Sequence, residues 1–215
     1  MNPAPPVTTA RTALSYEPLM FITFEGLDGS GKTTQARLLA EHLAAEGRDV
    51  VWTREPGGTP LGERVRDVLL HGGDVSPWAE AALFAAARAE LVEHVIRPAL
   101  GRGADVVCDR YLDSSLAYQG IARGLGVDPV LELNLAVVGG LLPDRTFVLL
   151  LDPAAAAGRS RRDPDRIERE AAEFHATLDR AYRELAERFP ERIVALDGSA
   201  MPEELAERVR EEVEG

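Results

Sequence analysis

Short apolar runs alternate with longer segments of helical periodicity over most of the chain. The apolar runs predict strands at 20–24, 50–52, 104–108, 145–151 and 192–196. Between them, apolar residues recur every three or four positions, which predicts helices near 36–47, 60–69, 77–100, 112–140, 167–188 and 202–213. A glycine-rich break interrupts the fourth helix at 120–126. Strands that alternate with helices form parallel sheets, so the pattern predicts a single α/β domain with a five-stranded parallel sheet and helices on both faces.

The N-terminal segment does not follow this pattern. Residues 1–19 are rich in proline, threonine and alanine, and they lack the continuous apolar segment of a secretory signal. We expect a disordered tail here, because the segment has little apolar surface to bury on ordering. The folded domain is expected to span 20–215, and either Met1 or Met20 can be the functional start.

Composition excludes several classes of function. The chain has 215 residues and a formal net charge of −12, which argues against a nucleic-acid polymer as partner, because such proteins present a basic face. No apolar run approaches the ~20 residues that span a bilayer, so no membrane partner is expected. The single cysteine, Cys108, follows two valines in a predicted strand and is interpreted as a buried, unreactive thiol. A chain without an internal disulfide fits a cytoplasmic location.

One glycine-rich stretch carries the strongest chemical signal. Residues 26–33 read GLDGSGKT and fit the phosphate-binding pattern G-x-x-x-x-G-K-[ST]. Glycines let the backbone approach a ligand, and the N–H groups of the loop and of the following helix attract phosphate. Lys32 would bridge the β- and γ-phosphates, and Thr33 would offer its hydroxyl to Mg²⁺. An ordinary glycine turn is the alternative, but the order strand, loop, helix favours a nucleotide site.

Two further strand ends carry charged residues. Arg54 follows the strand at 50–52, close to two glycines that leave room for an anion. Asp109 and Arg110 end the strand at 104–108, where P-loop proteins hold Mg²⁺ and where an arginine would bring donors to phosphates. A solvated loop side chain explains Arg54 equally well. A surface ion pair is a fair alternative for Arg110 alone, and a weaker one for the pair.

A group of four arginines has two interpretations. Within eight positions the acidic chain carries Arg159, Arg161, Arg162 and Arg166. They form either a lid that supplies an arginine finger or a solvated helix face with ion pairs four residues apart, and their spacing does not decide between the two.

An aromatic residue and an arginine on the segment 77–100 are equally ambiguous. Phe84 and Arg88 lie one helical turn apart among alanines, which leaves space for a flat ligand. An aromatic residue at helical spacing is more often part of a core than of a binding site.

Several segments together match a known family. They read FEGLDGSGKTTQ at 24–35, TREPGGT at 53–59, FAAAR at 84–88, DRYLDSSLAYQG at 109–120 and DRIE at 165–168. In this order they make the chain resemble the bacterial thymidylate kinases, a branch of the P-loop nucleoside monophosphate kinases. The combination is highly specific, whereas the P-loop alone is not. The resemblance implies a single-domain P-loop kinase fold with a short arginine-rich lid. It also implies transfer of the γ-phosphoryl group of ATP to dTMP with Mg²⁺, a step of dTTP biosynthesis.

The resemblance implies a role for each matching residue. The ATP phosphates would be wrapped by Gly26, Leu27, Asp28, Gly29, Ser30, Gly31, Lys32, Thr33 and Thr34. Mg²⁺ would be held by Thr33 and Asp109. The dTMP site would contain Arg54, Phe84, Arg88, Arg110, Ser115, Tyr118 and Gln119. Within it, Arg54 and Arg110 would hold the phosphate, Phe84 would stack on thymine, and Arg88 would donate to its 4-carbonyl.

Catalysis is expected to involve the loop and the lid. The candidate catalytic residues are Asp28, Lys32, Arg110, Arg159, Arg161 and Arg166. Ser30 stands where some relatives carry a catalytic arginine, which assigns the transition-state arginine to the lid. The segment 152–165 looks shorter than is usual in the family, so the identity of that arginine stays open.

The resemblance also bears on assembly and on alternative functions. Members are typically homodimers, and the alanine-rich helix 77–100 is the expected interface, with intramolecular packing as the alternative. A kinase for another nucleoside monophosphate or a deoxynucleoside is the nearest alternative function. A GTPase-type switch is the more distant one. The guanine-reading segment N-K-x-D is absent, because Asn2 and Asn134 are the only asparagines.

Overall fold

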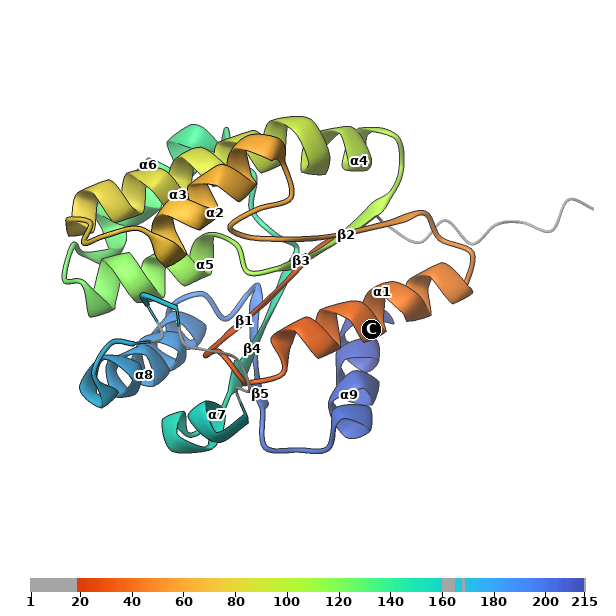
Figure 1. The fold of residues 1–215 in the computed structure, drawn as a ribbon. Helices are drawn as coiled ribbons and strands as arrows, with labels where there is room; N and C mark the ends of the chain where they lie inside the picture. Colours follow the sequence, from red (N-terminus) through yellow and green to blue (C-terminus); the bar gives the residue numbers. More distant parts are fainter. Residues whose placement is uncertain (1–18, 160–164, 168, 215) are drawn as a thin grey trace, which may run out of the picture.

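A parallel sheet forms the centre of the molecule, with helices on either side of it (Figure 1). The computed structural model describes residues 19–159, 165–167 and 169–214. The five strands have the spatial order β2-β3-β1-β4-β5, and all their pairings are parallel. Their bounds are β1 (Phe21–Gly26), β2 (Val50–Arg54), β3 (Asp105–Asp109), β4 (Arg145–Leu150) and β5 (Ile193–Asp197). The expected α/β class and strand number are confirmed, and the expected tail lies outside the described residues apart from Leu19.

One face of the sheet is covered by the helices α1 (Lys32–Ala45) and α9 (Pro202–Glu214), which also pack against each other. Ile22 and Phe24 of β1 point toward this face, where they join Leu39 and Leu43 of α1 in one apolar core. Side chains alternate along a strand, so the intervening residues of β1 serve the other face. The pattern explains why Phe21 belongs to the second core.

The opposite face carries most of the remaining helices. They are α2 (Pro60–His71), α3 (Pro77–Leu91), α4 (Arg97–Gly101), α5 (Leu112–Ser115), α6 (Val127–Val137) and α8 (Ala172–Arg188). A π-helical turn, η1 (Val92–Ile96), joins α3 to α4, so the helix expected at 77–100 is continuous but locally unwound. A second π-helical segment, η2 (Leu116–Ala122), ends at the expected glycine-rich break before α6. None of the helices in the described part of the chain combines the length and apolarity needed to cross a bilayer.

The segment between β4 and α8 differs from the sequence prediction. A short helix, α7 (Pro153–Arg159), follows β4 directly, where only a turn was predicted. Asp152 accepts hydrogen bonds from the N–H groups of Ala154 and Ala155, and this cap starts a run of alanines that favour helix.

The long helix predicted from residue 167 begins only at Ala172. Before this helix, Arg166 lies beside the end of α2, because its backbone N–H donates to the carbonyl oxygen of Leu70. This contact, between residues far apart in sequence, moves the start of the helix.

Candidate active site

The loop between β1 and α1 has the backbone geometry that its glycines allow. Gly26, Gly29 and Gly31 have φ angles of 135°, 82° and 99°. A Cβ atom on Gly29 would lie 2.2 Å from the carbonyl oxygen of Ala156, so α7 packs directly against the loop. A side chain at this position would therefore push the loop away from α7. The loop is held between the end of β4 and α7, with the first N–H groups of α1 behind it.

Lys32 and Asp28 form an ion pair inside this loop. The Lys32 ammonium lies 2.9 Å from Asp28 Oδ1 and also donates to the carbonyl oxygen of Leu27. The same Asp28 oxygen lies 2.8 Å from Arg110. Burial alone would raise the pKa of Asp28, but the charges of Arg110 and Lys32 outweigh it and hold the pKa far below its ordinary value. Asp28 is therefore an anion that joins two cations from separate segments.

Thr33 and Asp109 meet beside the loop. The Thr33 hydroxyl donates to Asp109 Oδ2 at 2.5 Å. The other oxygen, Asp109 Oδ1, is buried and has no hydrogen-bond partner among the described residues. A buried carboxylate oxygen that accepts no hydrogen bond is available to bind a metal ion. Carboxylate and hydroxyl oxygens are ligands that Mg²⁺ prefers. These two residues fit a Mg²⁺ ion.

Arg110 is held in an unusual conformation by residues that sequence reasoning missed. Its φ angle is 71°, in the left-handed region that glycine prefers. Glu25 stabilises the backbone after Arg110, because its carboxylate accepts hydrogen bonds from the N–H groups of Tyr111 and Ser114. The Arg110 guanidinium donates to the hydroxyls of Ser114, at 3.0 Å, and Tyr182, at 3.3 Å. Both hydroxyls in turn donate to Glu25.

Glu25 is almost fully buried in the middle of the sheet. Burial, followed by the nearby charge of Asp113, raises the pKa of the Glu25 carboxyl. The sequence contained one signal for this residue, since a glutamate inside an apolar strand requires partners. Ser114 and Tyr182 gave no comparable signal, because nothing local shows that they meet.

A cavity opens next to Arg110. It encloses about 490 Å³ of space, part of it open to solvent. Six of the predicted residues line it, namely Asp28, Phe84, Arg110, Ser115, Tyr118 and Gln119. The Arg110 guanidinium lies over the Tyr118 ring, 5.4 Å from its centroid. Several other residues that line the cavity were not predicted from the sequence, among them Glu55, Arg66, Leu70 and Ile167.

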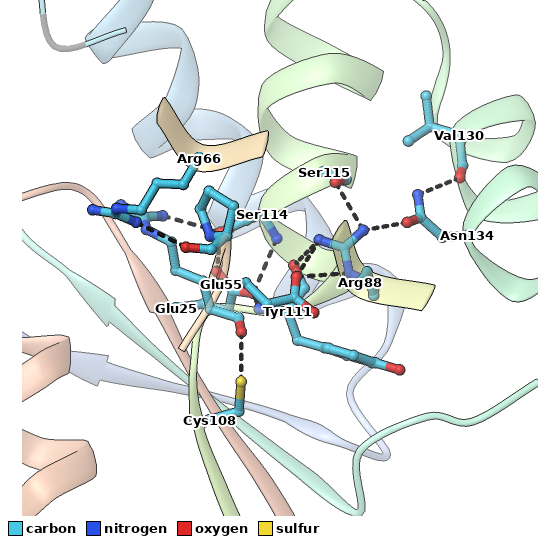
Figure 2. A network of polar contacts seen from close by, with 12 residues as sticks. Glu25, Glu55, Arg66, Arg88, Cys108, Tyr111, Ser114, Ser115, Val130 and Asn134 are labelled. Carbon is cyan, nitrogen blue, oxygen red and sulfur yellow. Dashed lines mark hydrogen bonds and ion pairs between the residues drawn. The ribbon is translucent and has the colours of Figure 1, made fainter. Parts of the chain in front are cut away.

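Arg88 lies behind the cavity and is not among the described residues that line it. Its guanidinium is almost fully buried and donates to Glu55, Ser115, Asn134 and the carbonyl oxygen of Tyr111 (Figure 2). Figure 2 shows these acceptors arranged around it. Burial raises the pKa of Glu55 to about 7, although the Arg88 charge opposes this shift. In this arrangement Arg88 supports the wall through Ser115 and Glu55.

Arg54 also stays outside the cavity lining. The sequence placed it in the loop after the strand at 50–52, whereas it is the last residue of β2, opposite Asp109, and its guanidinium pairs with Glu63 of α2 at 2.9 Å. More than a third of the Arg54 side chain is exposed, so the pair is open to solvent and weak.

Two of the predicted lid arginines, Arg159 and Arg166, contact different parts of the fold. Arg159, the last residue of α7, donates to the carbonyl oxygen of Gly198 at 3.0 Å. Arg166 donates to the carbonyl oxygen of Leu69 and lies 2.6 Å from Glu80. Arg161 lies outside the described residues.

Comparisons with known proteins give one family. The family model described as thymidylate kinase matches residues 24–209. A thymidylate kinase of Synechococcus sp. (strain JA-3-3Ab) is 50% identical over 190 residues, which cover 88% of this chain and 93% of that protein. One from Deinococcus radiodurans is 47% identical over 189 residues, which cover 86% of this chain and 92% of that protein. The crystal structure of a thymidylate kinase from Ehrlichia chaffeensis superposes with a TM-score of 0.71 and 37% identity, over 83% of this chain and 93% of that one.

Proposed function

The chain belongs to the thymidylate kinase family and transfers a phosphoryl group from ATP to dTMP, and we propose that it does so in the cavity described above. The observation that carries this proposal is the position of Asp28. Its carboxylate contacts Lys32 of the phosphate-binding loop and Arg110 of the cavity, so the two cations converge at one point. Two phosphorylated ligands that bind Lys32 and Arg110 bring their phosphates together there.

The donor phosphates are assigned to the loop. Residues 26–34 present backbone N–H groups and the helix α1 N-terminus, which suit the β- and γ-phosphates. Lys32 would balance the charge that spreads over the γ-phosphoryl oxygens during transfer. Asp28 would give up contacts to both cations as the phosphates arrive, because all of these anions need the same donors.

Mg²⁺ is assigned to Thr33 and Asp109, whose oxygens lie beside the loop. When bound, the ion would neutralise charge on the β- and γ-phosphates. Asp109 contributes the buried oxygen that has no hydrogen-bond partner among the described residues.

The acceptor is assigned to the cavity. Arg110 would hold the dTMP phosphate, with its guanidinium oriented by Ser114 and Tyr182. Phe84 would stack on the thymine ring, for which base–aromatic contacts of roughly 1–3 kcal/mol in single-strand binders give a scale. Tyr118 would border the sugar and favour deoxyribose. An oxygen of the dTMP phosphate would attack the γ-phosphorus, and the bond to the ADP oxygen would break.

Two predicted residues of the dTMP site would have to change their ion-pair partners before they could bind dTMP. Arg54 and Arg88 would join the dTMP site only after leaving Glu63 and Glu55, respectively. The exposed ion pair of Arg54 costs little to break, whereas the buried pair of Arg88 costs much more. Arg159, Arg161 and Arg166 are the candidates for the lid arginine of the transition state, and Arg166 would have to leave Glu80 to take that role.

Assembly and location are further parts of the proposal. Trp78 within the segment 77–100 is exposed, and α2, which packs against this segment, exposes Leu61 and Val68; these apolar side chains support this region as a homodimer interface. The single buried cysteine supports a cytoplasmic location, where both nucleotides are available.

A coupled assay of ADP release tests the assigned site and its selectivity. The purified chain, ATP and Mg²⁺ are combined with dTMP, dUMP, UMP, dCMP, CMP or AMP. We expect dTMP to react best, dUMP less well for lack of the methyl group, and UMP and dCMP poorly. Faster reaction of CMP or AMP than of dTMP would contradict the thymine site. The variant Phe84→Ala should raise KM for dTMP with little change in KM for ATP.

A further inference from the structure

Glu80 of α3 is a buried carboxylate that receives hydrogen bonds from three side chains, two of them at the C-terminal end of η2. Gln119 Nε2 donates to Oε1 at 2.9 Å, and Arg166 donates to Oε2 at 2.6 Å. Arg123 donates to both oxygens at 3.3 and 3.4 Å. Only about 1% of Glu80 is exposed, so these contacts replace nearly all of its hydration. Packing alone would place an apolar residue here.

The bond to Gln119 determines which way the side-chain amide faces. An ionised carboxylate has only acceptors, so it bonds the NH₂ end of an amide and repels the carbonyl end. Burial would raise the pKa of Glu80, but hydrogen bonds from Gln119, Arg166 and Arg123 lower it, so the group stays ionised. Within the described residues, the bond to Glu80 is the only hydrogen bond of the Gln119 amide. Gln119 lines the cavity, so its carbonyl oxygen is the end left for a ligand.

We propose that Glu80 is a positioning residue for base selectivity, because it fixes the Gln119 amide with its carbonyl oxygen toward the base. The inference rests on the assignment of the base to this cavity. A pyrimidine with an N–H at ring position 3, as in thymine, can donate to that carbonyl oxygen. Cytosine carries a lone pair at the same ring nitrogen, so two acceptors would face each other. A site whose polar groups are fixed rejects the mismatched partner, since its own groups are left unpaired.

The arginines make the orientation hard to reverse. Arg166 and Arg123 bring two positive charges to Glu80, and Arg123 also lies 2.6 Å from Glu170. A neutral group at position 80 would remove the electrostatic reason for the amide to point its NH₂ inward. Glutamine at this position could donate to the Gln119 carbonyl, and the NH₂ group of Gln119 would then be free to turn toward the ligand.

The test compares kcat/KM for dTMP and dCMP in the full chain and in Glu80→Gln. We expect the dTMP preference to fall by about tenfold or more, mainly through a higher KM for dTMP. The double variant Glu80→Gln with Gln119→Leu should show no further loss beyond Gln119→Leu alone, because the effect passes through the amide. Additive losses, or an unchanged preference in Glu80→Gln, would overturn the proposal.

Three controls separate this role from a general structural one. Glu187→Gln changes an exposed glutamate on α8 and should leave the preference unchanged. Arg166→Met removes one of the two charges beside Glu80 and should lower the dTMP preference less than Glu80→Gln does, because Arg123 and Gln119 still donate to the carboxylate. Gln119→Leu leaves both arginines in contact with Glu80. If Glu80→Gln does not fold, the dTMP preference is measured in Gln119→Leu, and an unchanged preference in this variant overturns the proposal. Failure of the wild-type chain to phosphorylate dTMP would instead contradict the proposed function.

Discussion

The Glu55 carboxylate lies 2.6 Å from the guanidinium of Arg88, and both side chains are almost fully buried. Glu55 keeps one oxygen without a hydrogen-bond partner among the described residues, although it borders the cavity. The pair therefore links the wall of the site to the stability of the fold. Removing either partner would leave a buried charge alone, which typically costs 3–5 kcal/mol.

The first prediction concerns the pH dependence of stability. Burial raises the pKa of Glu55 from 4.5 to about 7 in the folded protein, so between these values the folded state binds more protons than the unfolded state. The contribution of Glu55 to stability is therefore fully present below pH 4.5 and is lost as pH rises through about 7. Each unit of pKa separation is worth about 1.4 kcal/mol.

Urea unfolding of the wild type and of Glu55→Gln at pH 5 and pH 8 checks this sign. The unfolding free energy of the wild type minus that of the variant should decrease toward pH 8. Glu187→Gln, which changes an exposed carboxylate, should show no such trend. An increase toward pH 8 would mean that the Arg88 charge, rather than burial, dominates the pKa of Glu55.

The second prediction concerns Lys32, the only lysine in the sequence. Lys32→Ala should lower kcat by about a hundredfold or more, because no neighbouring ammonium can replace the charge at the γ-phosphate. The melting temperature should change little, since Asp28 keeps its ion pair with Arg110. Arg37→Ala is the matched control, because it removes an exposed cation on the same helix. Wild-type turnover in Lys32→Ala would remove this residue from the reaction.

The third prediction concerns the hydroxyl of Tyr182, which lies between Glu25 and Arg110. Tyr182→Phe should raise KM for dTMP about three- to tenfold, as expected for one lost hydrogen bond of about 1 kcal/mol, while KM for ATP stays nearly constant. Tyr111→Phe is the control, because its hydroxyl donates to the Leu141 carbonyl instead. Equal effects of the two variants on KM for dTMP would show that Tyr182 does not orient Arg110.

The fourth prediction concerns the N-terminal segment. A chain that starts at Met20 should keep its melting temperature and its turnover. The backbone nitrogen of Met20 donates to Asp105, and a new α-ammonium group at this position would keep that contact. Asp105 also pairs with Arg48 at 2.6 Å, so its carboxylate stays compensated in either form. A drop of several degrees on truncation would show that residues 1–19 pack on the domain.

The sequence alone determined the five strands, most of the helices between them, the phosphate-binding loop and the family. These features depend on neighbours in the chain: apolar periodicity, glycines at fixed spacing, and short motifs. Parallel pairing then follows from the alternation of elements, and it brings Thr33 and Asp109 together because strand ends meet at one edge. Side chains at strand ends were for this reason the most predictable part of the site.

Only the tertiary structure decided which of the predicted side chains face the cavity. Arg88 and Phe84 share one helix, yet Phe84 lines the cavity, whereas Arg88 is drawn behind it by Glu55 and Asn134. Tyr182 meets Glu25 across 157 residues of sequence. A buried charge takes whichever partners the packing of distant elements provides, and no local pattern specifies that choice.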